Sequence, residues 1–206
     1  MNNQLQELLA ELEHFGNGND SATTERSRKM LNITRDTGEF LAVLVRATVA
    51  RRVLEIGTSN GYSTLWLASA AQAIGGSVTT VEFSDYKITL ATKTFARSGL
   101  ASFITSIQDD AGRVLERTAN SAFDFIFLDS ERPEYPGWWV NLRRVLRPGG
   151  LLVVDNATSH PQENGTVRRS RPNRSNLHNQ SRSRGQWRIH GSQSRHVMVG
   201  KIKLLT

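Results

Sequence analysis

The first fifty residues alternate apolar and polar positions with a helical period. Large apolar residues recur at the three- and four-residue spacing of one helix face, at Leu5, Leu8, Leu9 and Leu12. This spacing predicts an amphipathic helix that ends in the glycine- and asparagine-rich residues 16–20. Two further helices are predicted at residues 24–30 and 38–49. Helices are therefore expected to precede the rest of the fold.

From residue 52 onward, short β-branched runs alternate with longer helical stretches. Strands are predicted at residues 53–56, 78–83, 103–107, 123–128 and 151–154. Helices are predicted between them at residues 63–73, 85–97, 111–117 and 135–146. Such alternation indicates an α/β fold with a mostly parallel sheet and helices on both faces. Ligands bind beyond the carboxyl ends of strands in such sheets, so the residues that follow each strand are the candidates for function.

Composition divides the chain near residue 160. The net charge is +7, but residues 1–158 hold 16 basic against 18 acidic residues, and residues 159–206 hold 10 against 1. Residues 161–195 contain few large apolar residues and many Arg and Ser, a composition typical of disorder. We therefore expect one domain at residues 1–160 and a basic tail at residues 161–206. The tail is expected to be disordered or an aberrant, frameshift-like ending, with a natural basic extension as the alternative.

The sequence predicts no targeting signal. The chain has no cysteine, which excludes disulfides and thiolate metal sites. No apolar run approaches the roughly 20 residues of a membrane span. The N-terminus carries Glu7, Glu11 and Glu13 and lacks the basic start of a signal peptide. We expect a cytoplasmic protein with no membrane partner.

A loop with two glycines follows the first predicted strand. Glu55 and Gly57 end that strand, and Gly61 opens the next helix. Small residues let the backbone approach a ligand, and a helix N-terminus offers unpaired N–H groups. The spacing is not the Gly-x-Gly-x-x-Gly of dinucleotide-binding loops. A carboxylate at Glu55 would suit the amino-bearing methionine part of S-adenosylmethionine better than it would suit a pyrophosphate.

Acidic residues also follow the second and third predicted strands. Glu82 can accept hydrogen bonds from ribose hydroxyls, and Asp110 is placed to contact the adenine amino group. For any single residue, a turn glycine or a solvated strand end is an equally good interpretation. That interpretation weakens because all of these residues lie at consecutive strand ends.

A second group of oxygen ligands follows the fourth and fifth predicted strands. Asp129 comes after the fourth, and the pair Asp155-Asn156 after the fifth. Two carboxylates and an amide oxygen form the oxygen-only set that suits Mg²⁺. Such an ion would orient an acceptor hydroxyl and lower its pKa, so that its oxygen attacks the sulfonium methyl group. Asp155-Asn156 alone would be interpreted as a turn, and Asp129 shifts the balance toward a metal site.

In these segments the chain resembles the class I S-adenosylmethionine-dependent methyltransferases. Within them it resembles the cation-dependent O-methyltransferase family, which includes catechol and caffeoyl-CoA O-methyltransferases. The resemblance covers residues 5–160 and is most specific at residues 54–63, 127–129 with Tyr135, and 146–156. It implies a Rossmann-like methyltransferase fold and, because relatives are commonly dimers, a homodimer, although nothing in the sequence determines the oligomeric state. The cofactor contacts that it implies are Met30, Glu55, Gly57, Gly61, Ser63, Glu82, Asp110, Ala111 and Asp129, and the metal ligands are Asp129, Asp155 and Asn156.

The chain departs from the family pattern at two places. Relatives often carry a catalytic lysine three residues after the first metal-binding Asp, where this chain has Arg132. A guanidinium stays protonated and can only stabilise an anionic oxygen. Asp129 and Arg132 are therefore the candidate catalytic residues, and the base remains open between the metal alone, another group and water. In relatives a helix and a closing antiparallel hairpin follow the Asp-Asn pair. Here we expect that hairpin to be absent or aberrant, which would leave the fifth strand an exposed edge and the protein marginally stable.

The predicted function is S-adenosylmethionine-dependent transfer of a methyl group to a hydroxyl of a small phenolic or catechol-like acceptor, aided by Mg²⁺. One alternative is a nucleic-acid methyltransferase that uses the basic tail as a phosphate-binding arm, against which the slightly acidic body counts. The other is a cofactor-binding protein without turnover. Two interpretations are open for an aromatic group in the last predicted helix, a wall for a flat acceptor or core packing: Tyr135, Trp138 and Trp139.

Overall fold

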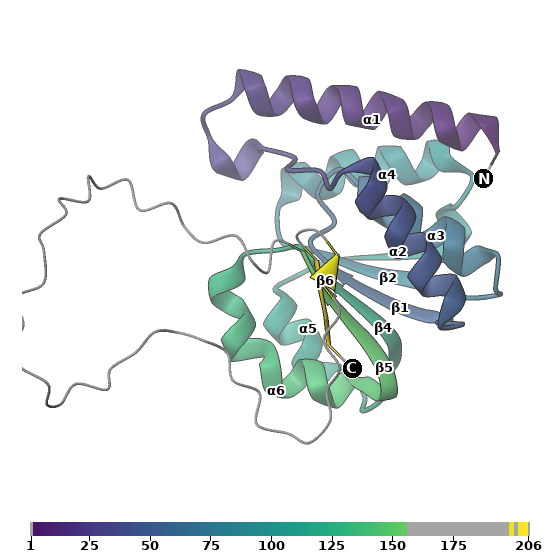
Figure 1. Cartoon of the computed structure of the whole chain (residues 1–206). Coiled ribbons are helices and arrows are strands. Elements are labelled where there is room, and N and C mark those ends of the chain that lie inside the picture. The colour runs from purple at the N-terminus through teal and green to yellow at the C-terminus, as the bar shows by residue number, and fades with distance from the viewer. Residues whose placement is uncertain (1, 156–197, 200–201, 206) are drawn as a thin grey trace, which may run out of the picture.

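The structure is a computed structural model that describes residues 2–155, 198–199 and 202–205 (Figure 1). Within these residues a seven-stranded sheet has the order β3-β2-β1-β4-β5-β7-β6. Strands β1 to β5 pair in parallel, as predicted. The bounds of the strands are β1 Arg52–Ile56, β2 Ser77–Glu82, β3 Ile104–Gln108, β4 Phe123–Leu128, β5 Leu146–Val154, β6 Met198–Val199 and β7 Ile202–Leu205.

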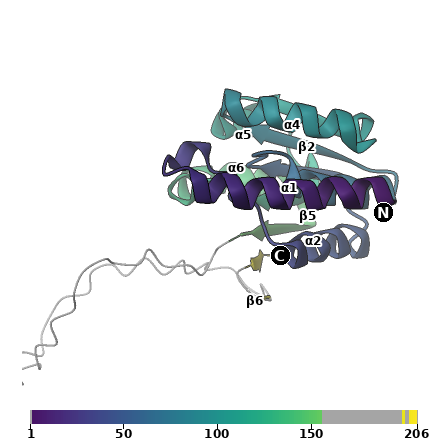
Figure 2. The same cartoon turned by 90° about the horizontal axis from the view of Figure 1, so that it is seen from above.

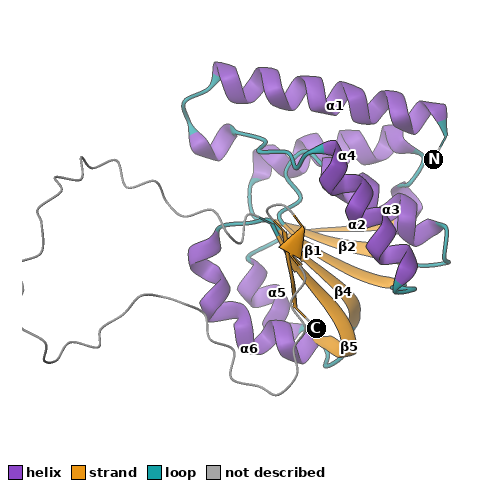
Figure 3. Ribbon diagram, in the orientation of Figure 1, coloured by secondary structure: helices purple, strands orange, loops and turns teal. Residues whose placement is uncertain are grey.

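Helices cover both faces of the sheet, which Figure 3 shows in purple around the orange strands. Their bounds are α1 Asn3–Ala22, α2 Arg35–Ala47, α3 Tyr62–Gln72, α4 Asp85–Ser98, α5 Ala111–Arg117 and α6 Tyr135–Val145. Three short 3-10 helices are η1 Arg26–Arg28, η2 Ala101–Phe103 and η3 Arg132–Glu134. Among the helices described, none is long and apolar enough to cross a membrane. The Rossmann-like α/β fold predicted from the sequence is confirmed.

The core has two halves, one on each face of the sheet. Alternate strand residues such as Val53 and Phe125 face helices α1 to α4. Their neighbours Leu54 and Ile126 face α5 and α6. Because both faces of the sheet are covered, β1 and β4 are apolar nearly throughout, which is typical of parallel sheets. Helix α1 packs on α3 and α4, and Figure 2 shows it lying across the molecule when seen from above.

The N-terminal helices differ from the prediction. Helix α1 runs through residues 16–20, where the sequence predicted its end. Gly16 lies within this helix, and a Cβ there would come within 2.5 Å of Asn32 Nδ2, so glycine allows the helix to pack closely against Asn32. The second predicted helix, at residues 24–30, is only the single turn η1. The third begins earlier than predicted because Thr34 caps it by accepting a hydrogen bond from Thr37 N.

The C-terminal end of the sheet also corrects an expectation. Strand β7 pairs antiparallel with β5, and β6 pairs antiparallel with β7. The hairpin expected to be absent or aberrant is therefore present in short form among the described residues, and β5 is paired at residues 152–154, so the exposed edge expected in the absence of a hairpin does not occur there. An open strand edge offers unpaired N–H and C=O groups, and the apolar sequence near the C-terminus supplies a strand for it. The predicted tail between residues 161 and 195 and the domain boundary at residue 160 lie outside the described residues.

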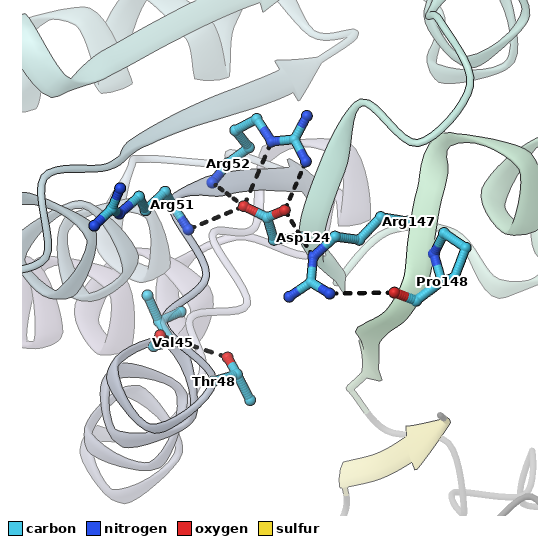
Figure 4. Close-up of polar contacts among 7 residues, drawn as sticks. All are labelled: Val45, Thr48, Arg51, Arg52, Asp124, Arg147 and Pro148. Atoms are coloured by element: carbon cyan, nitrogen blue, oxygen red, sulfur yellow. Dashed lines mark hydrogen bonds and ion pairs between the residues drawn. The ribbon is translucent and has the colours of Figure 1, made fainter.

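A buried carboxylate joins β1, β4 and β5 at the end of the strands opposite the predicted site (Figure 4). Asp124 in β4 accepts hydrogen bonds from the backbone N–H groups of Arg51 and Arg52 at 3.1 and 2.9 Å. It also accepts from Arg52 Nη2 at 2.7 Å and from Arg147 Nε, in β5, at 2.9 Å. Burial alone would raise the pKa of Asp124, but these bonds lower it to about 2. The cluster ties β1, β4 and β5 together by a charge held inside the protein.

Candidate functional site

The carboxyl ends of four parallel strands meet at one edge of the sheet. Ile56 of β1 aligns with Val81 of β2 and with Leu128 of β4, which aligns with Val154 of β5. The backbone ladder continues one residue further, since Asp129 N donates to Ile56 O at 3.0 Å and Asp155 N donates to Leu128 O at 3.0 Å. The structure therefore brings together four of the predicted site residues, Gly57, Glu82, Asp129 and Asp155.

Both glycines of the β1–α3 loop are required by the backbone. Gly57 has φ +107°, and a Cβ there would overlap the main-chain carbonyl of Asp129, 2.7 Å from its carbon. Gly61 has φ +89° at the N-cap of α3, and a Cβ there would lie 2.6 Å from the Phe95 ring. Positive φ and close approach both favour glycine. The two glycines let the loop pack against β4 and α4, whatever ligand it binds.

Glu55 is enclosed in the protein by hydroxyl groups. Its carboxylate accepts from Ser63 Oγ at 2.6 Å, from Thr80 Oγ1 at 2.7 Å and from Thr64 Oγ1. Burial raises the pKa of Glu55 to about 7, although the hydroxyl hydrogen bonds act in the opposite direction. The sequence placed Glu55 and Ser63 near the methionine part of the cofactor. In the structure their side chains bind each other and fix the first turn of α3 to β1 and β2.

The raised pKa of Glu55 makes folding depend on pH. The neutral carboxyl is favoured in the folded protein, so the stability from this group is present below about pH 4.5 and is lost as the pH rises through about 7. The wild type should lose roughly 3 kcal/mol of unfolding free energy from this group as the pH rises, and Glu55→Gln should not show that loss. Denaturant unfolding of both proteins at pH 5 and pH 8 measures it. A stability difference between wild type and variant that stays constant across that range would contradict the prediction.

Glu82 holds the start of the β2–α4 connection. Its carboxylate accepts from the backbone N–H groups of Ser59 at 2.9 Å, Phe83 at 3.1 Å and Ser84 at 3.0 Å. The Phe83 side chain next to it is 74% exposed, which is unusual for so large an apolar group. The end of β2 thus presents an acidic group and an exposed aromatic ring side by side.

Asp110 and Ala111 open helix α5 at the end of β3. Asp110 is the N-cap and accepts from Arg113 N at 2.9 Å. A Cβ on Gly112 would lie 3.1 Å both from Asp110 Oδ1 and from Trp138 Nε1, so α6 packs close to this helix start. The cap accounts for Asp110 structurally, and its contact with adenine stays a prediction.

Met30 lies against the β1–α3 loop although it is far away in sequence. Its side chain is 2% exposed. Its N–H donates to Asp20 Oδ1 at 2.6 Å, and its carbonyl accepts from Ser59 Oγ at 2.7 Å. Asp20 at the end of α1 therefore anchors the segment, and Ser59 joins it to the β1–α3 loop. The structure thus places Met30 beside this loop, and its contact with the cofactor stays a prediction.

Asp129 and Asp155 influence each other at the adjacent ends of β4 and β5. Burial raises the pKa of Asp129 well above its ordinary value, and the negative charges of Asp155 and Glu55 raise it further, whereas Lys87 and Arg132 lower it. Carboxylate oxygens at adjacent strand ends are of the kind that Mg²⁺ prefers as ligands. Among the described residues, no group of three or more His, Cys, Asp or Glu could hold a metal ion. Asn156, the third predicted ligand, lies outside the described residues.

The aromatic group of α6 packs against the core. Tyr135, Trp138 and Trp139 are partly buried against the cluster that contains Leu142 and Val145. The Tyr135 and Trp138 rings lie 5.9 Å apart. Core packing is therefore the interpretation that the contacts favour for these side chains.

Three residues of the site were missed in the sequence. Ser59 adopts φ +50° and bonds both Glu82 and Met30, and Lys87 acts electrostatically on Asp129. Asn60 is buried, with its Oδ1 accepting from Tyr62 N at 3.2 Å, and its Nδ2 has no hydrogen-bond partner in the part of the chain that the structure describes. Asn60 could have been noticed as a polar residue between two glycines. Ser59 and Lys87 act through contacts with distant segments, which leave no local signal.

Comparison with known proteins agrees with this geometry. The sequence model of the O-methyltransferase family matches residues 3–180. A catechol O-methyltransferase of Niastella koreensis is 31% identical over 139 residues, which are 66% of this chain and 62% of that protein. The chain spans about three fifths of the length of the curated relatives it matches.

Solved structures of O-methyltransferases share the fold. That of Bacillus cereus in complex with SAH is 30% identical, with a TM-score of 0.63 over 76% of this chain and 67% of that one. That of Streptomyces achromogenes involved in tomaymycin synthesis, in complex with SAM, is 28% identical, with a TM-score of 0.62 over 76% and 66%. With the strand order, the glycine loop and the family match together, the chain belongs to the O-methyltransferase family.

Proposed function

We propose that this protein is an S-adenosylmethionine-dependent O-methyltransferase that acts on a small phenolic or catechol-like hydroxyl. The observation that carries the proposal is the meeting of Gly57, Glu82, Asp129 and Asp155 at one edge of the sheet, where ligands of such sheets bind. Relatives named catechol O-methyltransferase and structures with SAM or SAH bound support it.

The end of β2 fits the adenosine part of the cofactor. The Glu82 carboxylate accepts hydrogen bonds, so it suits ribose hydroxyls, and the exposed Phe83 ring offers an apolar surface to a flat base. On this proposal Glu55 and Asp129, at the adjacent ends of β1 and β4, attract the positively charged methionine part of the cofactor. The cofactor contacts that we propose are Met30, Glu55, Gly57, Gly61, Ser63, Glu82, Asp110, Ala111 and Asp129. Since the Glu55 and Ser63 side chains bind each other, these two would also act by fixing the first turn of α3.

The acceptor would lie beside the carboxylates at the ends of β4 and β5. Their mutual repulsion at Asp129 supports a divalent cation, most simply Mg²⁺, held by Asp129, Asp155 and Asn156. When bound, the ion lowers the pKa of an acceptor hydroxyl. The protein's own part is to orient that hydroxyl toward the sulfonium methyl group.

Arg132 takes the position where relatives carry a lysine base. It begins the exposed turn η3, directly after the Asp129 loop. Its guanidinium stays protonated, so it stabilises the anionic acceptor oxygen and the hydroxyl proton passes to water. This arrangement predicts slower turnover at low pH, where fewer acceptor hydroxyls lose their proton.

Metal removal separates the proposal from its alternatives. With radiolabelled S-adenosylmethionine and a panel of catechols, we expect methyl transfer that falls at least about tenfold when EDTA replaces Mg²⁺. Activity that survives chelation would contradict the metal site. Binding of S-adenosylhomocysteine, measured by calorimetry, without transfer to any catechol would instead favour a cofactor-binding protein without turnover.

A further inference from the structure

One tyrosine hydroxyl holds the loop that follows β4. Tyr135, the first residue of α6, has its hydroxyl folded back on Ser130. It accepts from Ser130 N at 2.8 Å and donates to Ser130 O at 2.9 Å. Both polar groups of one loop residue are thus satisfied by a single side chain. The ring itself packs beside Trp138 and against the core.

The peptide next to Ser130 is held from its other side by the end of β1 and the β1–α3 loop. Asp129 N donates to Ile56 O at 3.0 Å. A Cβ at Gly57 would overlap the Asp129 carbonyl and would lie 3.4 Å from Ser130 N. The backbone that carries the Asp129 carboxylate is therefore fixed between the β1–α3 loop and the Tyr135 hydroxyl.

We propose that Tyr135 is a positioning residue that sets the place of the Asp129 carboxylate through Ser130. This inference rests on the proposed function of Asp129. The residues that follow Ser130 in the loop, Glu131 and Arg132, are exposed. The Tyr135 hydroxyl therefore attaches this exposed loop to helix α6. The hydroxyl gives its proton to Ser130 O and accepts from Ser130 N, so the role proposed for it is to position the loop and not to act on the acceptor.

Loss of this hydroxyl should affect binding more than folding. Tyr135→Phe keeps the ring and its packing but leaves the Ser130 N–H and C=O without their partner. Substitutions behind a metal ligand typically cost 10–100-fold in metal affinity or activity. We expect the dissociation constant for Mn²⁺ to rise about tenfold. We expect kcat with catechol to fall by about 10–100-fold with little change in the KM for S-adenosylmethionine.

Tyr62 provides a matched control. Its hydroxyl donates to Glu13 Oε1 at 2.6 Å and ties α3 to α1, away from the Asp129 loop. Tyr62→Phe removes a tyrosine hydroxyl that donates one hydrogen bond to a carboxylate, so its melting temperature shows what the loss of a tyrosine hydroxyl bond between two elements costs in stability. Mn²⁺ binding by electron paramagnetic resonance, S-adenosylhomocysteine binding by calorimetry and kcat are measured for wild type and both variants.

The outcomes separate this inference from the proposed function. Weaker Mn²⁺ binding and lower kcat in Tyr135→Phe, but not in Tyr62→Phe, support it. A lower melting temperature in Tyr135→Phe with unchanged Mn²⁺ binding and unchanged kcat overturns it. If wild type transfers methyl groups without binding Mn²⁺, the metal site fails, and kcat alone decides the inference. If wild type neither binds S-adenosylhomocysteine nor transfers methyl groups, the proposed function fails and the inference falls with it.

Discussion

Gly57→Ala is expected to destabilise the protein by about 3 kcal/mol or more and to abolish S-adenosylhomocysteine binding. The added Cβ would overlap the main-chain carbonyl of Asp129, and neither backbone can shift without breaking the sheet edge. The φ of +107° adds strain that a side chain cannot avoid. Denaturant unfolding and calorimetric titration with S-adenosylhomocysteine measure the two effects.

Gly75→Ala separates the strain from the overlap. Gly75 also has positive φ, +70°, but no atom lies within 4 Å of the Cβ that would be added. The Gly75→Ala variant should lose only about 1 kcal/mol of unfolding free energy and should still bind S-adenosylhomocysteine. Equal losses in the two variants would contradict the overlap at Gly57. Their difference measures the cost of the overlap between the added Cβ and the Asp129 carbonyl, together with the greater backbone strain at φ +107°.

Asp124→Asn should cost about 3 kcal/mol of stability, because it removes a buried charge that accepts hydrogen bonds from two arginine side chains and two backbone N–H groups. The loss is measured by denaturant unfolding at pH 6. Methyl transfer at a temperature where the variant stays folded should be unchanged, because the cluster lies at the opposite end of the strands from the site.

The effect of Asp124 depends on pH in a known direction. The folded pKa of about 2 lies below its ordinary value, so the stability from this carboxylate is present above about pH 4 and is lost as the pH falls toward 2. The stability difference between wild type and Asp124→Asn should narrow by about 1 kcal/mol between pH 6 and pH 3. Asp109→Asn is the control, since Asp109 forms ion pairs with Arg113 and Arg117 at the surface and its loss should cost less. A gap that widens at low pH would contradict the assignment.

The sheet could be predicted because its strands are buried on both faces and are separated by clear helical stretches. Helix α5 was predicted at its observed bounds, where Asp110 caps its start. The N-terminal region failed at Gly16, which looks like a helix end in the sequence and is a packing position in the structure. The form of the closing hairpin could not be predicted either, because strand β7 depends on the free edge that β5 supplies, and local composition does not reveal that edge.

The site was predictable where topology alone decides it. Residues that follow parallel strands must meet, so Glu82, Asp129 and Asp155 could be found from the strand ends. The partners of these residues could not be found in this way. Glu55 is enclosed by hydroxyls from β2 and α3, and Asp129 is held through Ser130 by Tyr135. Such pairings depend on side-chain directions that only the folded chain defines.

The contact at Gly57 has a consequence for how this family can diverge. Two backbones touch there, so glycine is required for folding even in a relative that has lost its cofactor. The exposed Phe83 side chain is under that demand to a lesser degree, whereas Glu82 also holds the start of the β2–α4 connection. In a relative without activity we therefore expect the glycine to persist while the residue at position 83 changes. The glycine would then indicate common descent, and the residue at position 83 would indicate whether cofactor binding has been kept.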